Sequence, residues 1–237
     1  MKAIILAGGL GTRISEETAD KPKPMVRIGQ QPIIWHLMSI FASQGINEFI
    51  IATGYKGEVI QKWVEGLQTD WQISAIDTGL ETQTGGRIRE CMRMVPGQRV
   101  IATYGDGLGN VNLSQLLHFH KMHGLLGTVT AVRPPARFGV LESSNGVVTH
   151  FGEKNQTDSG WINGGFFVLE PEVAEMVHDA REPFETGAIP RLVSVKQLAA
   201  FHHEGFWQPM DTLREKEDLE RLASLGDPPW MKMERSE

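Results

Sequence analysis

Short apolar runs alternate with segments of helical spacing along the first half of the chain. Runs rich in Ile and Val predict strands at Ala3–Leu6, Phe49–Thr53, Gln72–Ile76 and Val100–Thr103. Between the strands, apolar residues recur every three or four positions, as one buried face of a helix requires. This alternation of strands and helices predicts a mostly parallel sheet that helices cover on both faces.

Three helices connect these predicted strands. The first should begin near Pro32, because proline favours the first turn of a helix. The predicted apolar faces are Ile33, Ile34, Leu37, Met38 and Phe41 in the first helix, Val59, Ile60, Trp63 and Val64 in the second, and Ile88, Cys91, Met92 and Val95 in the third.

The second half of the chain has a different pattern. Thr128–Val132 and Ile162–Leu169 are predicted strands. Gly139–Leu141 and Val147–Phe151 flank an Asn-Gly pair, which is typical of a tight hairpin turn. No composition shift marks a linker, so the hairpin extends one domain instead of starting a second one.

Two helices complete the predicted second half. One begins at Pro171 and runs to Val177. Asp211 or Thr212 caps a last helix that runs to Leu222, with Leu213, Leu219 and Leu222 on its apolar face. The predicted fold is therefore α/β: a Rossmann-like, mostly parallel sheet flanked by helices, with a small β-hairpin extension.

Composition and charge narrow the functional classes. With 237 residues and 41% hydrophobic residues, the chain can bury a sizeable core, which excludes a disordered protein. The net charge of −6 argues against nucleic acid and anionic membranes as partners, because both bind a basic surface. A single cysteine, Cys91, allows no internal disulfide, and the short N-terminal apolar run is neither a signal nor a membrane segment. We expect a cytoplasmic protein.

A glycine-rich loop directly follows the first strand. Gly8-Gly9-Leu10-Gly11-Thr12-Arg13 can bring backbone N–H groups close to an anion. A phosphate loop would end in Gly-Lys-Ser/Thr, and a dinucleotide fingerprint would have a glycine where Ile14 stands. Both alternatives are disfavoured. A nucleotide-binding loop with its own cation, Arg13, remains, beside the alternative of an ordinary surface loop.

The segment after this loop adds cations. In Lys21-Pro22-Lys23-Pro24-Met25 two prolines disfavour a helix and should hold both lysines in an extended stretch near the loop. Residues 1–27 carry five cations and three acids, whereas the chain from Asp211 onward is net acidic. A locally basic crevice in an acidic protein suits a small phosphate ligand.

Asp106 stands between two glycines after the fourth predicted strand. If the first four strands lie in the order 3-2-1-4, the ends of strands one and four are neighbours, and ligands bind where the order reverses. The glycine loop and Asp106 would then face one crevice. A carboxylate there could hold Mg²⁺ between phosphates or could simply cap a turn, and the residues alone do not decide.

The histidines suggest no metal site. His118, His120 and His123 lie on a helical segment where no acidic partner shares their register, so we expect a solvated helix face. His202 and His203 would point to opposite faces of a strand.

The same motifs are similar to those of the sugar-phosphate nucleotidyltransferases, and within them to the glucose-1-phosphate cytidylyltransferases. Leu6–Arg13 and the Lys-Pro-Lys-Pro-Met segment carry the resemblance to the wider superfamily. The resemblance to the cytidylyl branch in particular is carried most specifically by Thr84-Gly85-Gly86-Arg87 and by the stretch Gly205–Arg214. The resemblance runs in order along nearly the whole chain.

This resemblance implies a role for each matching residue. Residues 1–125 would form a nucleotide-binding core, and residues 126–237 a sugar-phosphate-binding half with the C-terminal helix, within a single domain of residues 1–237. The implied catalytic cations are Arg13, Lys23 and Lys154, and the implied Mg²⁺ ligands are Asp106 and Asp211. The implied nucleotide-binding residues are Leu6, Ala7, Gly8, Gly9, Gly11, Thr12, Thr84, Gly85, Gly86, Arg87 and Gly105, and the implied sugar-binding residues are Gly139, Glu153, Asn163 and Gly164.

The implied reaction is that of CTP with α-D-glucose 1-phosphate, giving CDP-glucose and pyrophosphate in a homo-oligomer. The alternatives are UTP or dTTP as the nucleotide, another sugar 1-phosphate, or a catalytically inert nucleotide-sugar sensor. Two features depart from the family pattern: Asn155 replaces a proline after Glu-Lys, and the interval from Ile60 to Asp77 is shorter. The first departure affects the placement of Lys154, and the second affects substrate choice and oligomeric state.

Overall fold

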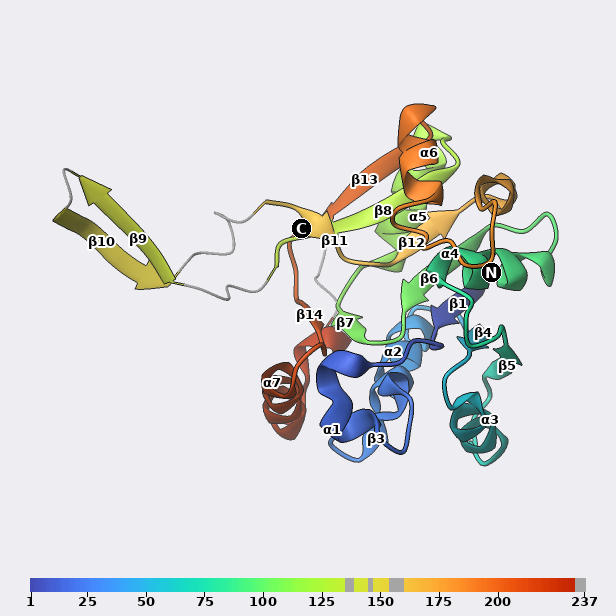
Figure 1. The fold of residues 1–237 in the computed structure, drawn as a ribbon, viewed down its shortest axis with the longest axis horizontal. Coiled ribbons are helices and arrows are strands. Elements are labelled where there is room, and N and C mark those ends of the chain that lie inside the picture. The colour runs from blue at the N-terminus through green and yellow to red at the C-terminus, as the bar shows by residue number, and fades with distance from the viewer. Residues whose placement is uncertain (135–138, 145–146, 154–159, 233–237) are drawn as a thin grey trace.

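The computed structural model describes residues 1–134, 139–144, 147–153 and 160–232, and Figure 1 shows the arrangement of its elements. The main sheet has the strand order β11-β8-β12-β6-β1-β4-β5, and β13 also pairs with β8. Its strands are β1 (Lys2–Leu6), β4 (Glu48–Thr53), β5 (Gln72–Asp77), β6 (Val100–Tyr104), β8 (Gly127–Val132), β11 (Ile162–Asn163), β12 (Phe167–Leu169) and β13 (Leu198–His203).

Four neighbouring strands of this sheet run parallel. β4 pairs with β1 and β5, and β1 pairs with β6, all in parallel register. The predicted order 3-2-1-4 of the first four strands is thus confirmed, together with the α/β class. The order places the carboxyl ends of β1 and β6 side by side, and the N–H of Gly105 donates to the carbonyl of Leu6 at 2.9 Å.

Helices cover both faces of the sheet. They are α1 (Ser15–Thr18), α2 (Ile33–Ala42), α3 (Gly57–Glu65), α4 (Thr84–Arg93), α5 (Leu113–His123), α6 (Ala188–Ser194) and α7 (Leu213–Ser224), with 3-10 helices at Thr12–Ile14, Lys23–Met25, Pro171–Met176 and Pro229–Met231. Within these described residues, no helix is long and apolar enough to cross a membrane.

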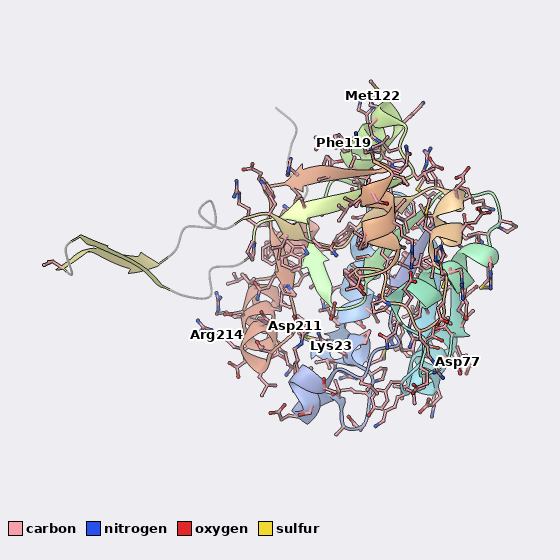
Figure 2. All side chains as sticks on the ribbon, turned by 45° about the horizontal axis from the view of Figure 1, so that its top comes forward. Lys23, Asp77, Phe119, Met122, Asp211 and Arg214 are labelled. Carbon is pink, nitrogen blue, oxygen red and sulfur yellow. The ribbon has the colours of Figure 1, made fainter. Side chains whose placement is uncertain are left out.

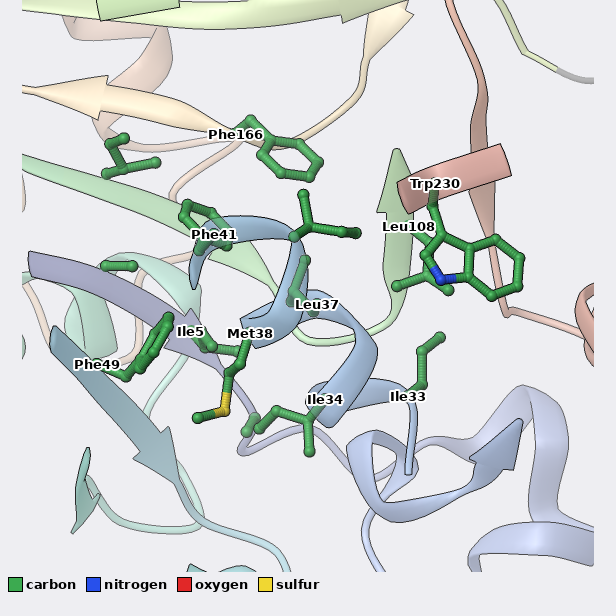
Figure 3. Packing of buried hydrophobic residues seen from close by; sticks show 14 of the residues in the cluster. Ile5, Ile33, Ile34, Leu37, Met38, Phe41, Phe49, Leu108, Phe166 and Trp230 are labelled. Atoms are coloured by element: carbon green, nitrogen blue, oxygen red, sulfur yellow. The ribbon is translucent and has the colours of Figure 1, made fainter. Parts of the chain in front are cut away.

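Alternate side chains of β1 enter different cores. Ala3 and Ile5 belong to one hydrophobic cluster, together with the apolar face of α2, with Leu219 of α7 and with Trp230. Figure 3 shows part of this cluster. Ile4 and Leu6 belong to a second cluster with α4 and α6. A strand that is buried on both faces reads as a continuous apolar run, which is why the sequence revealed it clearly.

Among the described residues, six small strands lie outside the main sheet. β7 (Gly107–Gly109) pairs with β14 (Trp207–Pro209), and β2 (Arg27–Ile28) pairs with β3 (Gln31–Pro32). β9 (Gly139–Ser144) and β10 (Val147–Glu153) form the predicted hairpin, and its Asn-Gly turn lies outside the described residues. The β7–β14 pair matters for the site because it joins residue 107 to the residues before α7.

Several local predictions were wrong. The expected strand Ile162–Leu169 divides into β11 and β12, because Gly165 and Phe166 both have positive φ, at 76° and 48°. Lys23–Met25 is one turn of 3-10 helix instead of extended chain. The helix predicted from Pro171 does begin there, but it is a 3-10 helix that ends at Met176. Leu213 is 39% exposed, because its position in the first turn of α7 points it away from the core.

A buried arginine ties together the ends of the three parallel strands beneath the glycine loop. Arg87 is 4% exposed, and Nη1 donates to the carbonyl of Thr53 at 2.6 Å and to Thr78 Oγ1. Nη2 donates to the carbonyl of Gly8 at 3.1 Å. The resemblance implies that Arg87 binds the nucleotide; in the structure α4 directs its guanidinium under the glycine loop. Gly8 has no side chain because the guanidinium occupies that space.

A second polar cluster lies between α5 and the sheet. His120 is 1% exposed; Nδ1 lies 2.8 Å from Thr128 Oγ1 and Nε2 lies 3.1 Å from Glu170 Oε1. Arg99 pairs with the same carboxylate. Burial lowers the pKa of His120, and the hydrogen bond to Glu170 opposes this only in part. The expected solvated histidine face is therefore wrong for His120, which the helix turns inward.

We expect Gly8→Ala to lower the free energy of unfolding by about 1–3 kcal/mol, the usual cost of overpacking. An added Cβ would lie 2.1 Å from Arg87 Cζ. Gly9→Ala is the matched control, since no heavy atom lies within 4 Å of its added Cβ. Urea denaturation of both variants measures the difference, and equal stabilities would contradict the packing role of Arg87.

We expect stability to decline as the pH falls below about 6.5, where unfolded His120 takes up a proton that the folded protein does not bind. One such group changes the free energy of unfolding by at most about 1.4 kcal/mol per pH unit. Urea unfolding between about pH 7.5 and 5.5 gives the slope. The slope should be shallower in His120→Gln than in His118→Gln, whose residue is exposed on the same helix. Identical slopes would assign the pH dependence to other groups.

Candidate active site

A cleft of ≈ 590 Å³ opens at the carboxyl ends of β1 and β6. This is the edge where the sequence had placed the glycine loop and Asp106. The predicted residues that line the cleft are Leu6, Ala7, Gly8, Gly9, Gly11, Thr12, Arg13, Lys23, Thr84, Arg87, Gly105, Asp106 and Asp211. Residues from the two ends of the chain thus share one wall.

At Gly11 the glycine loop takes a left-handed backbone conformation that favours glycine. Gly11 has φ 64°, and an added Cβ would lie 3.0 Å from Thr18 Cγ2 and 3.1 Å from Lys23 Cβ. The Gly11 carbonyl accepts hydrogen bonds from Thr18 Oγ1 and from the N–H of Ile14. The loop is therefore closed against the 3-10 helix that follows, which leaves Gly9 and Leu10 exposed at the cleft.

One ammonium group joins the two aspartates. Lys23 Nζ donates to Asp106 Oδ2 at 2.6 Å and to Asp211 Oδ1 at 2.7 Å. Arg13 Nη1 donates to the other oxygen of Asp211, also at 2.7 Å. Figure 2 shows Lys23 and Asp211 close together although 188 positions separate them. Carboxylates therefore pair with Lys23 and Arg13, so this part of the crevice is a charge-balanced cluster and not simply basic.

The environment of Lys23 keeps it charged. Its side chain is 11% exposed, and this burial lowers the pKa of the ammonium. The attraction of Asp106 and the hydrogen bonds to Asp106 and Asp211 outweigh burial and raise the pKa above the ordinary lysine value. Arg13, in contrast, has a side chain that is 73% exposed and can turn toward a ligand.

The backbone around Asp211 is fixed by the helix that follows it. Thr212 caps α7 and forms a capping box with Glu215. Glu215 Oε2 also accepts from the N–H of Asp211 at 2.7 Å. On the other side, the N–H of Met210 donates to the carbonyl of Asp106 at 2.8 Å. The two aspartates are therefore held in register by backbone contacts as well as by Lys23.

The two carboxylates suit a divalent cation. Both reach the same ammonium, so their oxygens converge on one point of the cleft. Mg²⁺ is usually bound by one or two carboxylates together with substrate phosphates. Within the part of the chain that is described, no group of three or more His, Cys, Asp or Glu forms a complete protein cage. Asp106 and Asp211 thus fit a metal that the phosphates of a ligand help to hold.

The second glycine turn has a packing role. Gly85 donates its N–H to the carbonyl of Glu182 at 3.1 Å, and an added Cβ on Gly86 would lie 2.2 Å from the carbonyl oxygen of Ala180. Both glycines let residues 180–184 lie against the start of α4. Only Thr84 and Arg87 of this motif line the cleft.

Two of the four predicted sugar-binding residues, Asn163 and Gly164, lie next to this cleft. Asn163 is exposed, and its Nδ2 donates to the hydroxyl of Tyr104, which lines the cleft. Gly164 is buried and accepts a hydrogen bond from Trp207 Nε1 at 2.9 Å. The backbone of Gly139 and Glu153 belongs to the β9–β10 hairpin. Lys154, the third predicted cation, lies outside the described residues.

Sequence reasoning missed one wall of the cleft. Leu80, Glu81, Thr82 and Gln83 line it between β5 and α4. They follow the carboxyl end of a strand parallel to β1, so the rule that places ligands at these ends could have found them. Tyr104 also lines the cleft.

Comparison with known proteins identifies relatives over most of the chain. The nucleotidyl transferase family model matches residues 2–214. Glucose-1-phosphate cytidylyltransferase from Salmonella typhi is 43% identical over 253 aligned positions, which cover 97% of this chain and 98% of that protein. The mannose-1-phosphate guanyltransferase from Saccharomyces cerevisiae is 30% identical over 90% of this chain and 63% of that protein.

Solved structures share the fold at low sequence identity. A UDP-glucose pyrophosphorylase in complex with UDP-glucose superposes with a TM-score of 0.74 at 16% identity, covering 95% of this chain and 98% of that one. A CTP:phosphocholine cytidylyltransferase from Streptococcus pneumoniae gives 0.66 at 18% identity, covering 94% and 98%. With the family match over most of its length and a full-length relative at 43% identity, the chain belongs to the nucleotidyl transferase family.

Proposed function

We propose that the protein transfers a cytidylyl group from CTP to α-D-glucose 1-phosphate, which gives CDP-glucose and pyrophosphate. The observation that carries the proposal is the Lys23–Asp106–Asp211 cluster at the mouth of the glycine loop. The full-length Salmonella typhi relative supports the choice of nucleotide and sugar.

The nucleophile needs little activation. A phosphate monoester has a second pKa of about 6, so the sugar phosphate is already an anion at neutral pH and needs no general base. The difficulty is the approach of two polyanions, which the site must neutralise and align for in-line attack on the α-phosphorus. Mg²⁺ held by Asp106 and Asp211 would screen the phosphates.

The cations of the chain have distinct positions for this task. Lys23 is fixed beside both aspartates, where it can stabilise charge that develops on the α-phosphate. Arg13 is exposed at the end of the glycine loop, so its side chain can stay in contact with the pyrophosphate as this group leaves. We assign Lys154 to the sugar phosphate by resemblance to the family. The backbone of residues 6–12 and Gly105 would bind the nucleotide.

The proposal extends to the whole chain. Residues 1–125 would bind the nucleotide, and residues 126–237, including the β9–β10 hairpin, would bind the sugar phosphate within one domain. Asn163, Gly164, Gly139 and Glu153 would contact the sugar. By the same resemblance we propose a homo-oligomer in the cytoplasm.

A second candidate keeps the chemistry but changes a substrate. The alignment with the Salmonella typhi relative has 253 positions, which exceeds the 237 residues of this chain, so that relative has residues with no counterpart here. We place the shortening between Ile60 and Asp77, in the connection from α3 to β5. UTP, dTTP or another sugar 1-phosphate is therefore the alternative, followed by a sensor that binds without reacting.

A pyrophosphate-release screen tests these candidates together. CTP, UTP, dTTP and GTP are each incubated with glucose, galactose and mannose 1-phosphates and Mg²⁺. We expect the highest kcat/KM with CTP and glucose 1-phosphate. A higher value for another pair would reassign the substrates, and binding of CTP without pyrophosphate release would support the sensor.

We expect Lys23→Ala to lower kcat by about a hundredfold, the usual loss for one preorganised electrostatic group. Lys21→Ala is the matched control, because Lys21 pairs with Glu17 and Asp20 on the outer side of the segment. Steady-state kinetics of both variants decides the matter, with thermal unfolding to check that they are folded. Near-normal turnover in Lys23→Ala would remove it from the mechanism.

We expect Asp106→Ala to abolish Mg²⁺-dependent turnover, because one of the two converging carboxylates is lost. Calorimetric titration of Mg²⁺ in the presence of CTP should show the same loss. Asp218→Ala is the control, since Asp218 lies on α7 and pairs with Arg221. An unchanged Mg²⁺ dependence in Asp106→Ala would contradict the assignment.

A further inference from the structure

A chain of hydrogen bonds links the two sides of the cleft through a carboxylate behind its wall. Asn163 Nδ2 donates to Tyr104 Oη at 3.0 Å, and Tyr104 Oη donates to Glu185 Oε1 at 2.5 Å. Thr84 Oγ1 donates to the other oxygen, Glu185 Oε2, at 2.7 Å. Tyr104 and Thr84 line the cleft, whereas Glu185 lies behind them.

The direction of each hydrogen bond follows from the carboxylate. An ionised carboxylate only accepts, so both hydroxyls must turn their protons toward Glu185. The oxygen of Thr84 then accepts from the N–H of Phe184 at 2.8 Å. The single hydroxyl proton of Tyr104 is used in the hydrogen bond that it donates to Glu185. Toward Asn163 the hydroxyl oxygen can therefore only accept, so the amide nitrogen of Asn163 must face it.

The other end of the Asn163 amide is also fixed. Its Oδ1 accepts from the N–H of Gly165 at 2.9 Å. The oxygen and nitrogen of an asparagine amide can be distinguished only through their hydrogen-bond partners. Here the Gly165 N–H is a donor at one end and the Tyr104 oxygen is an acceptor at the other, so the orientation is defined. One N–H of the exposed Asn163 amide is therefore left to donate outward.

The ring of Tyr104 has little freedom. It packs edge-on against Phe167 with centroids 5.9 Å apart, and an added Cβ on Gly165 would lie 3.1 Å from the ring. Burial, followed by the charge of Glu185, raises the pKa of the Tyr104 phenol far above its ordinary value, so the phenol keeps its proton. The position and the protonation of the hydroxyl are thus both set by its surroundings.

We propose that Glu185 is a positioning residue for the sugar 1-phosphate: through Tyr104 it orients Asn163 so that this amide donates to a hydroxyl oxygen of the sugar. The inference rests on the proposed function, because it takes the sugar as the ligand at Asn163. Glu185 itself does not touch the substrate. It determines which end of the amide the substrate meets.

Glu185→Gln isolates this effect. The amide oxygen of the new side chain can still accept from Thr84, while its NH₂ group faces Tyr104 and donates to it. The Tyr104 proton is then free to point at Asn163, whose amide must flip and lose its bond with Gly165. We expect the KM for glucose 1-phosphate to rise about tenfold, as for one lost polar contact, with the KM for CTP changed less than about twofold.

The test measures both KM values and kcat in the wild type, Glu185→Gln, Tyr104→Phe and the double variant. If Glu185 acts through Tyr104, the double variant should be no worse than Tyr104→Phe alone. Glu182→Gln is the matched control, since Glu182 lies three residues away and pairs with Arg191. The control should leave both KM values unchanged, and thermal unfolding checks that each variant is folded.

Three outcomes would overturn the inference: an unchanged KM for glucose 1-phosphate in Glu185→Gln, equal rises for both substrates, or effects that multiply in the double variant. Failure of the proposed function is a separate result, namely a wild type that does not turn over CTP with glucose 1-phosphate. In that case ¹³C NMR of labelled tyrosine decides, because the chain has only two tyrosines. Glucose 1-phosphate should shift the Tyr104 signal in the wild type and not in Glu185→Gln, and equal shifts would also reject the inference.

Discussion

The site depends on one buried ammonium group shared between two carboxylates. Lys23 contacts Asp106 and Asp211, which come from different parts of the chain. Without this cation, Asp106 would lose its charged partner in a partly buried position, which is costly, whereas Asp211 would keep its pair with Arg13. The 3-10 turn after the glycine loop, the end of β6 and the start of α7 are therefore held together electrostatically, and the cleft lies between them.

The parts of the fold that follow from local pattern were predictable from the sequence. Four apolar runs identified the parallel strands, and the rule for ligands at a reversal of strand order placed Gly8–Arg13 beside Asp106. For β1, β4 and β6 these inferences succeed because strands buried on both faces must be apolar throughout, whereas β5 lies at the sheet edge and alternates between apolar and polar residues. The chemistry of the loop, a glycine with positive φ at Gly11, could also be anticipated.

The remaining features arise from contacts between residues that are distant in sequence. No local pattern shows that the Arg87 side chain lies under Gly8. Nor does any local pattern show that Gly86 has no room for a side chain because the backbone of Ala180 packs against it. Likewise, His120 is buried because Thr128 and Glu170 meet it, and periodicity does not reveal these partners. A count of charges along the sequence suggested a basic crevice. The pairing of Lys23 with acids could not be seen in that count, because Asp211 lies 188 positions away.

The capping box of α7 has a consequence for how the protein is made. Asp211 reaches the cleft with its backbone held by Glu215, so residues through 215 must have left the ribosome before this carboxylate can take its place. The parallel strands and the glycine loop emerge more than a hundred residues earlier. A nascent chain can thus build its nucleotide-facing sheet while the acidic pair stays incomplete. Assembly of that pair is a late event in synthesis, and so is completion of the core, because Leu219 and Trp230 emerge later still.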